Sequence, residues 1–405
     1  MIDSERVIAD LRELARRTSD EAGAQRLCWG EGWRAARDFL GELLAEIGLE
    51  PEIDEAGNAW AYLRGEREPA LAIGSHLDSV PNGGWLDGAF GVMGALGVLR
   101  AWAGAEAQPP RTLALVDWAD EEGARFGRSL FGSSAAAGTF DPAELANARD
   151  ADARHAPEVL AENGVDLERV LDSRSRLDGL GAYLELHIEQ GPVLETEGIG
   201  AAAVSGCVGV ERLRFEITGR VSHAGTTPMD ARRDAGLAAA ATALRVEQIA
   251  VAEGGVGTVG EIGFEPGIPT AVPGRASLVV DLRNRSAEAL ARMLEATREV
   301  AAACAAQRGC EASEEQVWRI EPIAFDPELV ALAGEACERV AGTAYELSSG
   351  ALHDAASMAP LLPTAMVFSP SIGGVSHAPE EDTADPDLRE AIEAFGALVE
   401  LRLRG

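Results

Sequence analysis

A histidine and two acidic residues stand close together after a short apolar run. His76 and Asp78 are two residues apart, and Asp87 follows a glycine-rich segment. The apolar run at 70–73 predicts a buried strand, and α/β sheets bind ligands at the carboxyl ends of their strands. Imidazole and carboxylate are ligands for zinc and manganese. We therefore predict that His76 and Asp87 bind metal and that Asp78 orients His76 through its second ring nitrogen. A polar loop that caps a strand would fit this stretch alone equally well.

Similar chemical groups follow three other predicted strands. They are Glu121 and Glu122 after the strand at 112–118, His187 near the end of the strand at 182–188, and His377 after the strand at 364–368. A two-metal hydrolase needs ligands for two cations, a shared bridging carboxylate and a separate carboxylate that takes a proton from water. Each group alone has an ordinary structural explanation, such as a charge cluster at a helix start for the paired glutamates. Their joint occurrence favours a metal site.

The composition excludes several classes of protein. The 35 basic and 67 acidic residues give a net charge of −32, which argues against nucleic-acid and anionic-membrane partners. The sequence contains no lysine, which excludes a lysine Schiff base and a Walker-type phosphate loop. Five cysteines without a Cys-x-x-Cys pair predict reduced thiols. With no signal-peptide pattern and no run near the ~20 apolar residues of a membrane span, we expect a cytoplasmic protein.

The order of predicted elements indicates two domains. Strands alternate with helices over 1–208, which is typical of an α/β fold. From about Gly209 the predicted order changes to β-α-β-β-α, and the α/β pattern of strands and helices returns at 319–405. We therefore predict an α/β catalytic domain, formed by 1–208 and 319–405, with an α+β domain inserted at 209–318.

Seven motifs together resemble one enzyme family. They are Gly-Ser-His-Leu-Asp at 74–78, Asp-Glu-Glu-Gly-Ala-Arg-Phe at 120–126, Glu-Leu-His-Ile-Glu-Gln-Gly at 185–191, Ser-His-Ala-Gly-Thr-Thr-Pro-Met at 222–229, Pro-Gly and Asp-Leu-Arg within 273–283, Ser-Gly-Ala-Leu-His-Asp at 349–354 and Gly-Val-Ser-His at 374–377. The chain resembles the hydantoinase/carbamoylase branch of the zinc metallopeptidase-like amidases from about Gly30 onward. Peptide-cleaving and acylase relatives usually carry a second acidic residue after the bridging aspartate. Here Gly88 follows Asp87, as in the carbamoylase branch.

The resemblance implies a metallopeptidase-like catalytic domain that holds two divalent cations per subunit. Zn²⁺ or Mn²⁺ is expected, with Co²⁺ or Ni²⁺ as substitutes in vitro. The implied ligands are His76 and His187 for one metal, Glu122 and His377 for the other, and Asp87 between them. Glu121 would be the general base that activates water and later gives the proton to the leaving nitrogen.

The resemblance also implies that the inserted domain is a lid and dimerisation domain. In a homodimer, His223 would stabilise the developing oxyanion from the partner subunit, although it could instead cap its own turn. Arg283 would bind the substrate carboxylate, unless it forms only a surface ion pair, and Gln190 would assist on that side.

Two positions depart from the usual family pattern and bear on the substrate. Thr270 stands where the family often has asparagine, and Leu352 stands where glycine is common. We predict a dinuclear-metal amidohydrolase that converts an N-carbamoyl-L-amino acid to the amino acid, ammonia and carbon dioxide. Alternatives are allantoate or β-ureidopropionate amidohydrolase, an N-acyl amino acid hydrolase or dipeptidase on the same metals, and a catalytically silent metal-binding dimer.

Overall fold

The computed structural model describes residues 2–105 and 107–404, which fold as two compact units. The first unit comprises Met1–Gly206 and Ala324–Gly405, and the second comprises Cys207–Ile323. The predicted limits of the insertion, 209 and 318, lie inside the second unit.

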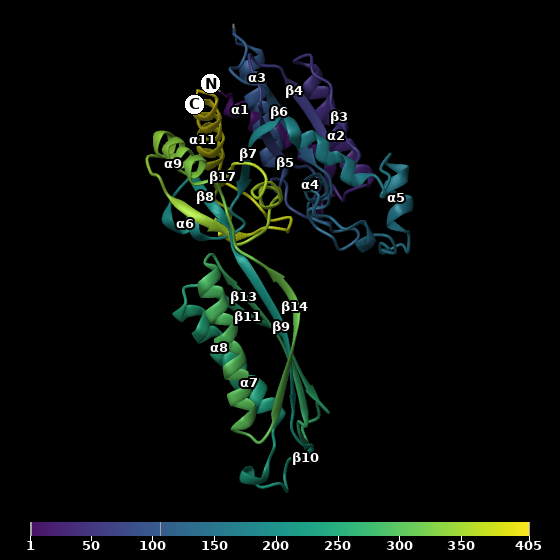
Figure 1. The fold of residues 1–405 in the computed structure, drawn as a ribbon, viewed down its shortest axis with the longest axis vertical. Coiled ribbons are helices and arrows are strands. Elements are labelled where there is room, and N and C mark those ends of the chain that lie inside the picture. Colours follow the sequence, from purple (N-terminus) through teal and green to yellow (C-terminus); the bar gives the residue numbers. More distant parts are fainter. Residues whose placement is uncertain (1, 106, 405) are drawn as a thin grey trace. The chain divides into compact units, whose positions relative to one another are not determined.

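A nine-stranded mixed sheet forms the centre of the first unit (Figure 1). Its strands are β3 (Glu52–Ile53), β4 (Ala59–Leu63), β5 (Ala70–His76), β6 (Leu113–Trp118), β7 (Leu180–Ile188), β8 (Ala202–Cys207), β15 (Ile323–Ala324), β16 (Glu346–Ser349) and β17 (Thr364–Ser369). The neighbours β17, β7, β5 and β6 run parallel in that order. Their carboxyl ends therefore lie along one edge, and the four predicted chemical clusters follow these four strands.

Helices of the first unit enclose this sheet. They are α1 (Ser4–Thr18), α2 (Glu31–Ala45), α3 (Ala89–Ala103), α4 (Phe131–Ala137), α5 (Ala156–Glu162), α6 (Val193–Glu197), α9 (Pro327–Ala341), α10 (Asp354–Met358) and α11 (Asp385–Arg404), and a small ribbon of β1 (Ser19–Asp20) and β2 (Gly23–Ala24) follows α1. Helix α3 is apolar on nearly all sides and packs on β5, β6 and β7. Such a helix needs burial on most faces, as its sequence predicted.

The second unit is an antiparallel sheet with two helices on one face (Figure 1). Its strands are β9 (Gly209–Thr218), β11 (Val256–Glu265), β13 (Arg275–Asn284) and β14 (Glu311–Ile320), its helices are α7 (Ala235–Ala252) and α8 (Ala287–Ala306), and β10 (Ser222–His223) pairs with β12 (Ala271–Val272). Alternate residues of β9 and β13 point into the core beneath the helices. Strand β14 was not predicted, because its residues are almost wholly exposed and show no apolar alternation.

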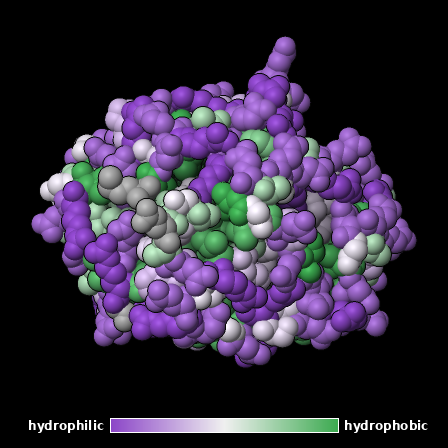
Figure 2. Space-filling model, turned by 90° about the horizontal axis from the view of Figure 1, so that it is seen from above, coloured by the Kyte–Doolittle hydropathy of each residue, from purple (hydrophilic) through white to green (hydrophobic). Residues whose placement is uncertain are grey.

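One described helix, α7, is apolar and long enough by length and composition to cross a membrane. The expectation from the sequence was that no such stretch exists. In the structure α7 packs on α8, β11 and β13, which is how the core helix of a globular unit behaves. The face of the molecule in Figure 2 is mostly hydrophilic, as expected for a chain with a net charge of −32.

Candidate metal centre

His76 is the last residue of β5 and is buried. Its Nδ1 lies 3.1 Å from the main-chain oxygen of Asp78, so Nδ1 carries the proton and Nε2 faces the site with a lone pair. The predicted partner, the Asp78 carboxylate, lies farther away, at 3.6 Å. The carbonyl of Asp78, rather than its carboxylate, therefore fixes the ring tautomer.

The Asp78 carboxylate orients a different part of the site. It accepts hydrogen bonds from the backbone N–H groups of Glu121 and Glu122, each at 3.2 Å. The loop after β5 is therefore joined to the loop after β6. The carboxylate of Asp78 was expected to orient the His76 ring, and in the structure it binds the main chain of the glutamate pair instead.

Asp87 lies between two clusters of metal-ligand type. One cluster is His76, Asp87 and His187, the other is Asp87, Glu122 and His377, and the donor atoms within each lie within 4.8 Å of one another. Asp87 Oδ1 is 3.2 Å from His187 Nε2, and Asp87 Oδ2 is 3.2 Å from His377 Nε2. The two oxygens of one carboxylate thus face different clusters, which is the arrangement expected of a bridging ligand.

The electrostatics of these clusters fit divalent cations. Burial alone would lower the pKa of His187, but the hydrogen bond and charge of Asp87 raise it to about 9. Asp87 likewise raises the pKa of His377 to about 9. Burial raises the pKa of Glu122 to about 8, and its Oε1 is buried without a hydrogen-bond partner among the described residues. Cations would replace these protons and satisfy that oxygen, and three protein donors per metal leave positions for water or substrate.

Glu121 is buried beside the first cluster but belongs to neither. Its Oε2 lies 3.7 Å from His76 Nε2. Burial, and next the charge of Asp354, raise the pKa of the Glu121 carboxyl well above its ordinary value. A carboxyl group beside the ligands with a raised pKa suits a residue that must hold a proton during a reaction.

Gly88 explains the close approach of the two ligand-bearing segments. It has a φ of 63°, and a Cβ at this position would lie 2.3 Å from ring atoms of His76. Its backbone nitrogen lies 3.3 Å from His187 Nε2. Only glycine fits here without displacing His76.

Gln190 is positioned against the bridging carboxylate. Its Nε2 donates to Asp87 Oδ2 at 3.0 Å and to Ser376 Oγ at 3.1 Å, and it lies 3.3 Å from His377 Nε2. These contacts place Gln190 beside the second cluster. Its predicted contact with substrate stays a prediction.

A buried arginine behind the predicted metal ligands was not recognised from the sequence. Arg26 is fully buried and donates from Nε to the Leu77 carbonyl at 2.7 Å, so it holds the loop between His76 and Asp87 from behind. Nothing in an isolated arginine 50 residues upstream signals this contact.

A third group of possible metal donors consists of Glu185, His187 and His353. We interpret Glu185 and His353 as structural residues around His187. Glu185 accepts from Ser75 Oγ at 2.7 Å and from the Ala355 N–H at 2.9 Å. His353 Nε2 lies 2.9 Å from the Ser349 hydroxyl. The His353 ring also lies beside the His187 ring, with 4.4 Å between their centroids. Since Glu185 and His353 already have hydrogen-bond partners, we interpret them as packing around His187.

The second unit places His223 and Thr270 together. His223 pairs with Ala271 in the small ribbon of β10 and β12, and the N–H of Ala224 donates to the Thr270 carbonyl at 2.9 Å. His223 Nδ1 accepts from the N–H groups of Gly225 at 3.0 Å and Thr226 at 3.3 Å. The ring therefore caps its own turn.

Arg283 lies near the end of β13, in the four-stranded sheet of the same unit. The ribbon with His223 joins β13 at Arg275, because Thr218 pairs with Arg275 and the Gly219 N–H donates to the Gly274 carbonyl. Eight residues of strand at ~3.3 Å each separate Arg275 from Arg283 by roughly 26 Å. Arg283 Nε donates to Asp281 Oδ1 at 2.8 Å. One copy of this unit therefore cannot bring both His223 and Arg283 to the same small molecule.

Leu352 lies partly exposed in the first unit, between β16 and α10.

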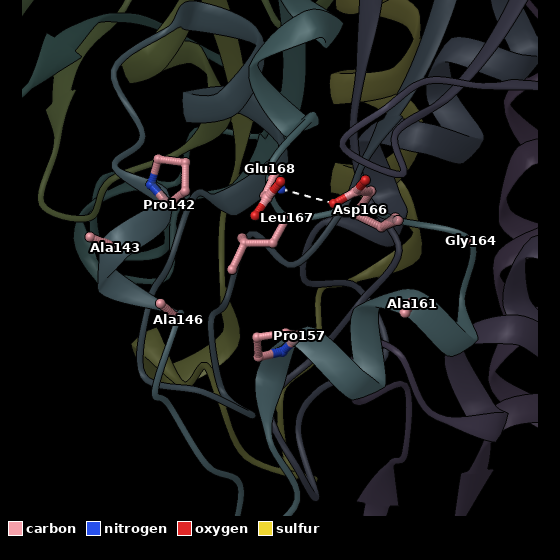
Figure 3. Close-up of a pocket in the computed structure, with 10 residues that line it drawn as sticks. Pro142, Ala143, Ala146, Pro157, Ala161, Gly164, Asp166, Leu167 and Glu168 are labelled. Atoms are coloured by element: carbon pink, nitrogen blue, oxygen red, sulfur yellow. Dashed lines mark hydrogen bonds between the residues drawn. The ribbon is translucent and has the colours of Figure 1, made fainter.

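The first unit also has a surface pocket of about 670 Å³ (Figure 3). Its lining is Pro142, Ala143, Ala146, Pro157, Ala161, Gly164, Val165, Asp166, Leu167 and Glu168. None of the predicted site residues lines it, and apart from its two acidic side chains the lining carries no group suited to catalysis.

Comparison with known proteins agrees with this chemistry. Residues 72–401 match Peptidase family M20/M25/M40, and the chain belongs to that family. The chain is 35% identical to N-carbamoyl-L-amino-acid amidohydrolase of Paenarthrobacter aurescens, over 96% of each chain. It is 31% identical to allantoate amidohydrolase of Bacillus subtilis, over 94% of this chain and 93% of that one.

A solved structure supports the same assignment. It is an amidase of the hydantoinase/carbamoylase family from Burkholderia multivorans, 32% identical, with a TM-score of 0.89 over 100% of this chain and 98% of that chain. The predicted family and fold class are thereby confirmed. The protein is a hydrolase that acts on C–N bonds.

Proposed function

We propose that this enzyme hydrolyses an N-carbamoyl-L-amino acid to the amino acid, ammonia and carbon dioxide. The observation that carries the proposal is the position of Asp87, whose two oxygens face two separate clusters of His and carboxylate donors. The name of the 35% identical relative from Paenarthrobacter aurescens supports this substrate class. Allantoate is the second candidate, because another full-length relative is named for it.

The residues present would hold two divalent cations, one on His76, His187 and Asp87 and one on Asp87, Glu122 and His377. When bound, such cations polarise a carbonyl group and lower the pKa of water. In the proposed mechanism Glu121 removes a proton from the attacking water and delivers it to the departing nitrogen. Asp78 holds the main chain of Glu121 during this transfer, since it accepts the Glu121 N–H.

The substrate's other groups would be bound by the second unit. We propose that Arg283 binds the carboxylate of the amino acid and that His223 donates to the oxyanion that develops on the carbamoyl group. Thr270, next to the His223 turn, and Leu352, in the first unit, would influence which side chain is accepted.

We propose a homodimer in which His223 comes from the partner subunit. The ~26 Å between the two ends of β13 supports this, because His223 and Arg283 of one copy cannot reach one substrate together. Helix α7 also carries exposed Leu237, Leu244 and Val251 at seven-residue spacing. This spacing places them on one helix face, and an exposed apolar stripe is suited to packing against a second copy.

A substrate panel tests the proposal. The metal-free protein would be loaded with Zn²⁺ or Mn²⁺ and assayed on N-carbamoyl-L-amino acids, allantoate, N-carbamoyl-β-alanine, N-acetyl amino acids and dipeptides. The highest kcat/KM is expected on an N-carbamoyl-L-amino acid, and a higher value on another class would replace the proposed substrate. Glu121→Gln should retain both metals and lose ~10²–10⁴ in kcat. Wild-type turnover in that variant would disprove the mechanism.

A further inference from the structure

The loop after β17 contains a buried glutamate that contacts the bridging ligand's main chain. Glu381 is 1% exposed. Its Oε1 accepts hydrogen bonds from the N–H groups of Leu86 at 3.1 Å and Asp87 at 3.0 Å. The backbone that carries Asp87 is thus held by a side chain almost 300 residues away in the sequence.

The other oxygen of Glu381 holds the loop that carries His377. Ser376 donates its hydroxyl hydrogen to Glu381 Oε2 at 2.7 Å, and Ser376 accepts from Gln190 Nε2 at 3.1 Å. Ser376 directly precedes His377. The Glu381 carboxylate therefore joins two segments of the chain. One carries Asp87, which belongs to both clusters, and the other carries His377, which belongs only to the second cluster.

His377 depends on its loop for its position. Its side chain is 51% exposed, so packing alone restrains it weakly, and its φ of 56° is unusual for a residue that is not glycine. The ring's Nε2 lies 3.2 Å from Asp87 Oδ2, 3.3 Å from Gln190 Nε2 and 3.5 Å from Glu122 Oε2, so the path of the loop decides whether the ring meets these groups.

The Glu381 side chain is itself confined. A Cβ at Gly84 would lie 1.9 Å from Glu381 Oε1, so the glycine leaves the space that this carboxylate occupies. A carboxylate that is confined on one side and hydrogen-bonded through both oxygens has a single position.

We propose that Glu381 is a positioning residue that sets the separation between Asp87 and His377, and with it the affinity of the second cluster for metal. Glu381 does not itself bind metal, because both of its oxygens are engaged by the protein. The inference rests on the proposed two-metal site. Residues that orient ligands from behind commonly contribute 10–100-fold to metal affinity.

Metal titration of the full-length, metal-free protein tests this directly. Zn²⁺ and Mn²⁺ binding would be measured calorimetrically in wild type, Glu381→Ala, Glu381→Gln and Glu380→Ala. Glu381→Ala should weaken one of the two sites by ~10–100-fold. Glu381→Gln should stay within about threefold of wild type, because its amide oxygen still accepts the two N–H groups. Glu380→Ala, which removes the exposed neighbouring carboxylate, should bind as wild type does.

The outcomes separate this inference from the proposed function. Failure of the wild type to bind two metals would overturn the proposed site itself. Two wild-type sites with unchanged affinities in Glu381→Ala, or an equal loss in Glu381→Gln, would overturn only the positioning role. If Glu381→Ala does not fold, Ser376→Ala serves instead, since it cuts the link to the His377 loop and leaves the N–H bonds of Leu86 and Asp87. Unchanged metal affinity in that variant would likewise refute the proposal.

Discussion

The carboxylate of Asp78 lies 3.2 Å from the backbone nitrogen of Glu121 and accepts its hydrogen bond. The same carboxylate accepts from the N–H of Glu122 at 3.2 Å. Asp78 therefore fixes the main chain of both Glu121, the proposed base, and Glu122, a proposed metal ligand. One side chain links the positions of these two glutamates.

Replacement of Asp78 should consequently affect both functions. Asp78→Ala leaves two buried N–H groups without their acceptor and should lower kcat by ~10–100-fold, with weaker metal binding. Asp78→Asn keeps one acceptor oxygen and should lose less. Steady-state kinetics and metal content of the purified variants measure the two effects. Wild-type values for both in Asp78→Ala would show that the Glu121 loop is held by other contacts.

Arg283 and Arg212 offer a matched pair for locating the substrate carboxylate. Arg283 Nε donates to Asp281 Oδ1 at 2.8 Å, and Arg212 Nη2 donates to Asp281 Oδ2 at 2.6 Å. If Arg283 binds the carboxylate, Arg283→Ala should raise KM by an amount equivalent to ~2–4 kcal/mol. Arg212→Ala, which disturbs the same aspartate, should change KM little. Similar effects from both variants would assign Arg283 a structural role.

Mixed dimers can show from which subunit His223 acts. His223→Ala and Glu121→Gln should each be nearly inactive alone. After mixing with subunit exchange, half of the dimers combine one chain of each kind and contain one site with both residues, so about a quarter of wild-type activity should return. No recovery, with exchange verified by mass spectrometry, would mean that His223 and Glu121 act within one chain.

Metal uptake should depend on pH in a defined direction. In the metal-free protein the pKa values of His187 and His377 are raised to about 9, so both rings are protonated at pH 7. His76, whose pKa burial lowers to about 3, is already neutral. Because metal binds the neutral ring, affinity should rise from pH 7 to pH 9 and then level off. Calorimetry in buffers of different ionisation enthalpy would detect the released protons, and a flat profile would contradict this interpretation.

The same groups link pH to the stability of the metal-free protein. A pKa raised above the usual 6.5 stabilises the fold fully below pH 6.5, and this contribution is lost as the pH rises through about 9. The Tm of the metal-free protein should therefore fall over that range. The metal-loaded protein, in which the protons have been displaced, should not show this component.

The sequence was sufficient to predict that the proposed ligands lie close together, because strand patterns and residue types pointed to the same place. Apolar runs before His76, Glu121 and His187 mark strands, and the parallel pairing of β5, β6 and β7 places the residues at their carboxyl ends along one edge. Residue type then indicated metal chemistry. The family resemblance implied that Asp87 is shared by two metals, and this role stays a prediction. In the structure the two oxygens of Asp87 lie 3.2 Å from His187 Nε2 and from His377 Nε2.

Contacts made by the main chain and by distant loops could not be predicted. The His76 ring is held by a carbonyl, which every residue possesses, so its carboxylate was the natural but wrong choice as the closer partner. Glu381 and Arg26 reach the Asp87 segment from opposite ends of the chain, and no local pattern marks either residue. Strand β14 was not predicted because an exposed edge strand lacks the alternation of apolar and polar residues that identifies a half-buried strand.

The left-handed backbone at Gly88 limits how this enzyme can change over evolutionary time. An acidic residue at this position, usual in peptide-cleaving relatives, would place its Cβ 2.3 Å from the His76 ring. A single substitution here cannot be accommodated while the loop keeps its present path. Any change away from glycine at position 88 therefore has to come with a second change that moves the backbone away from the His76 ring.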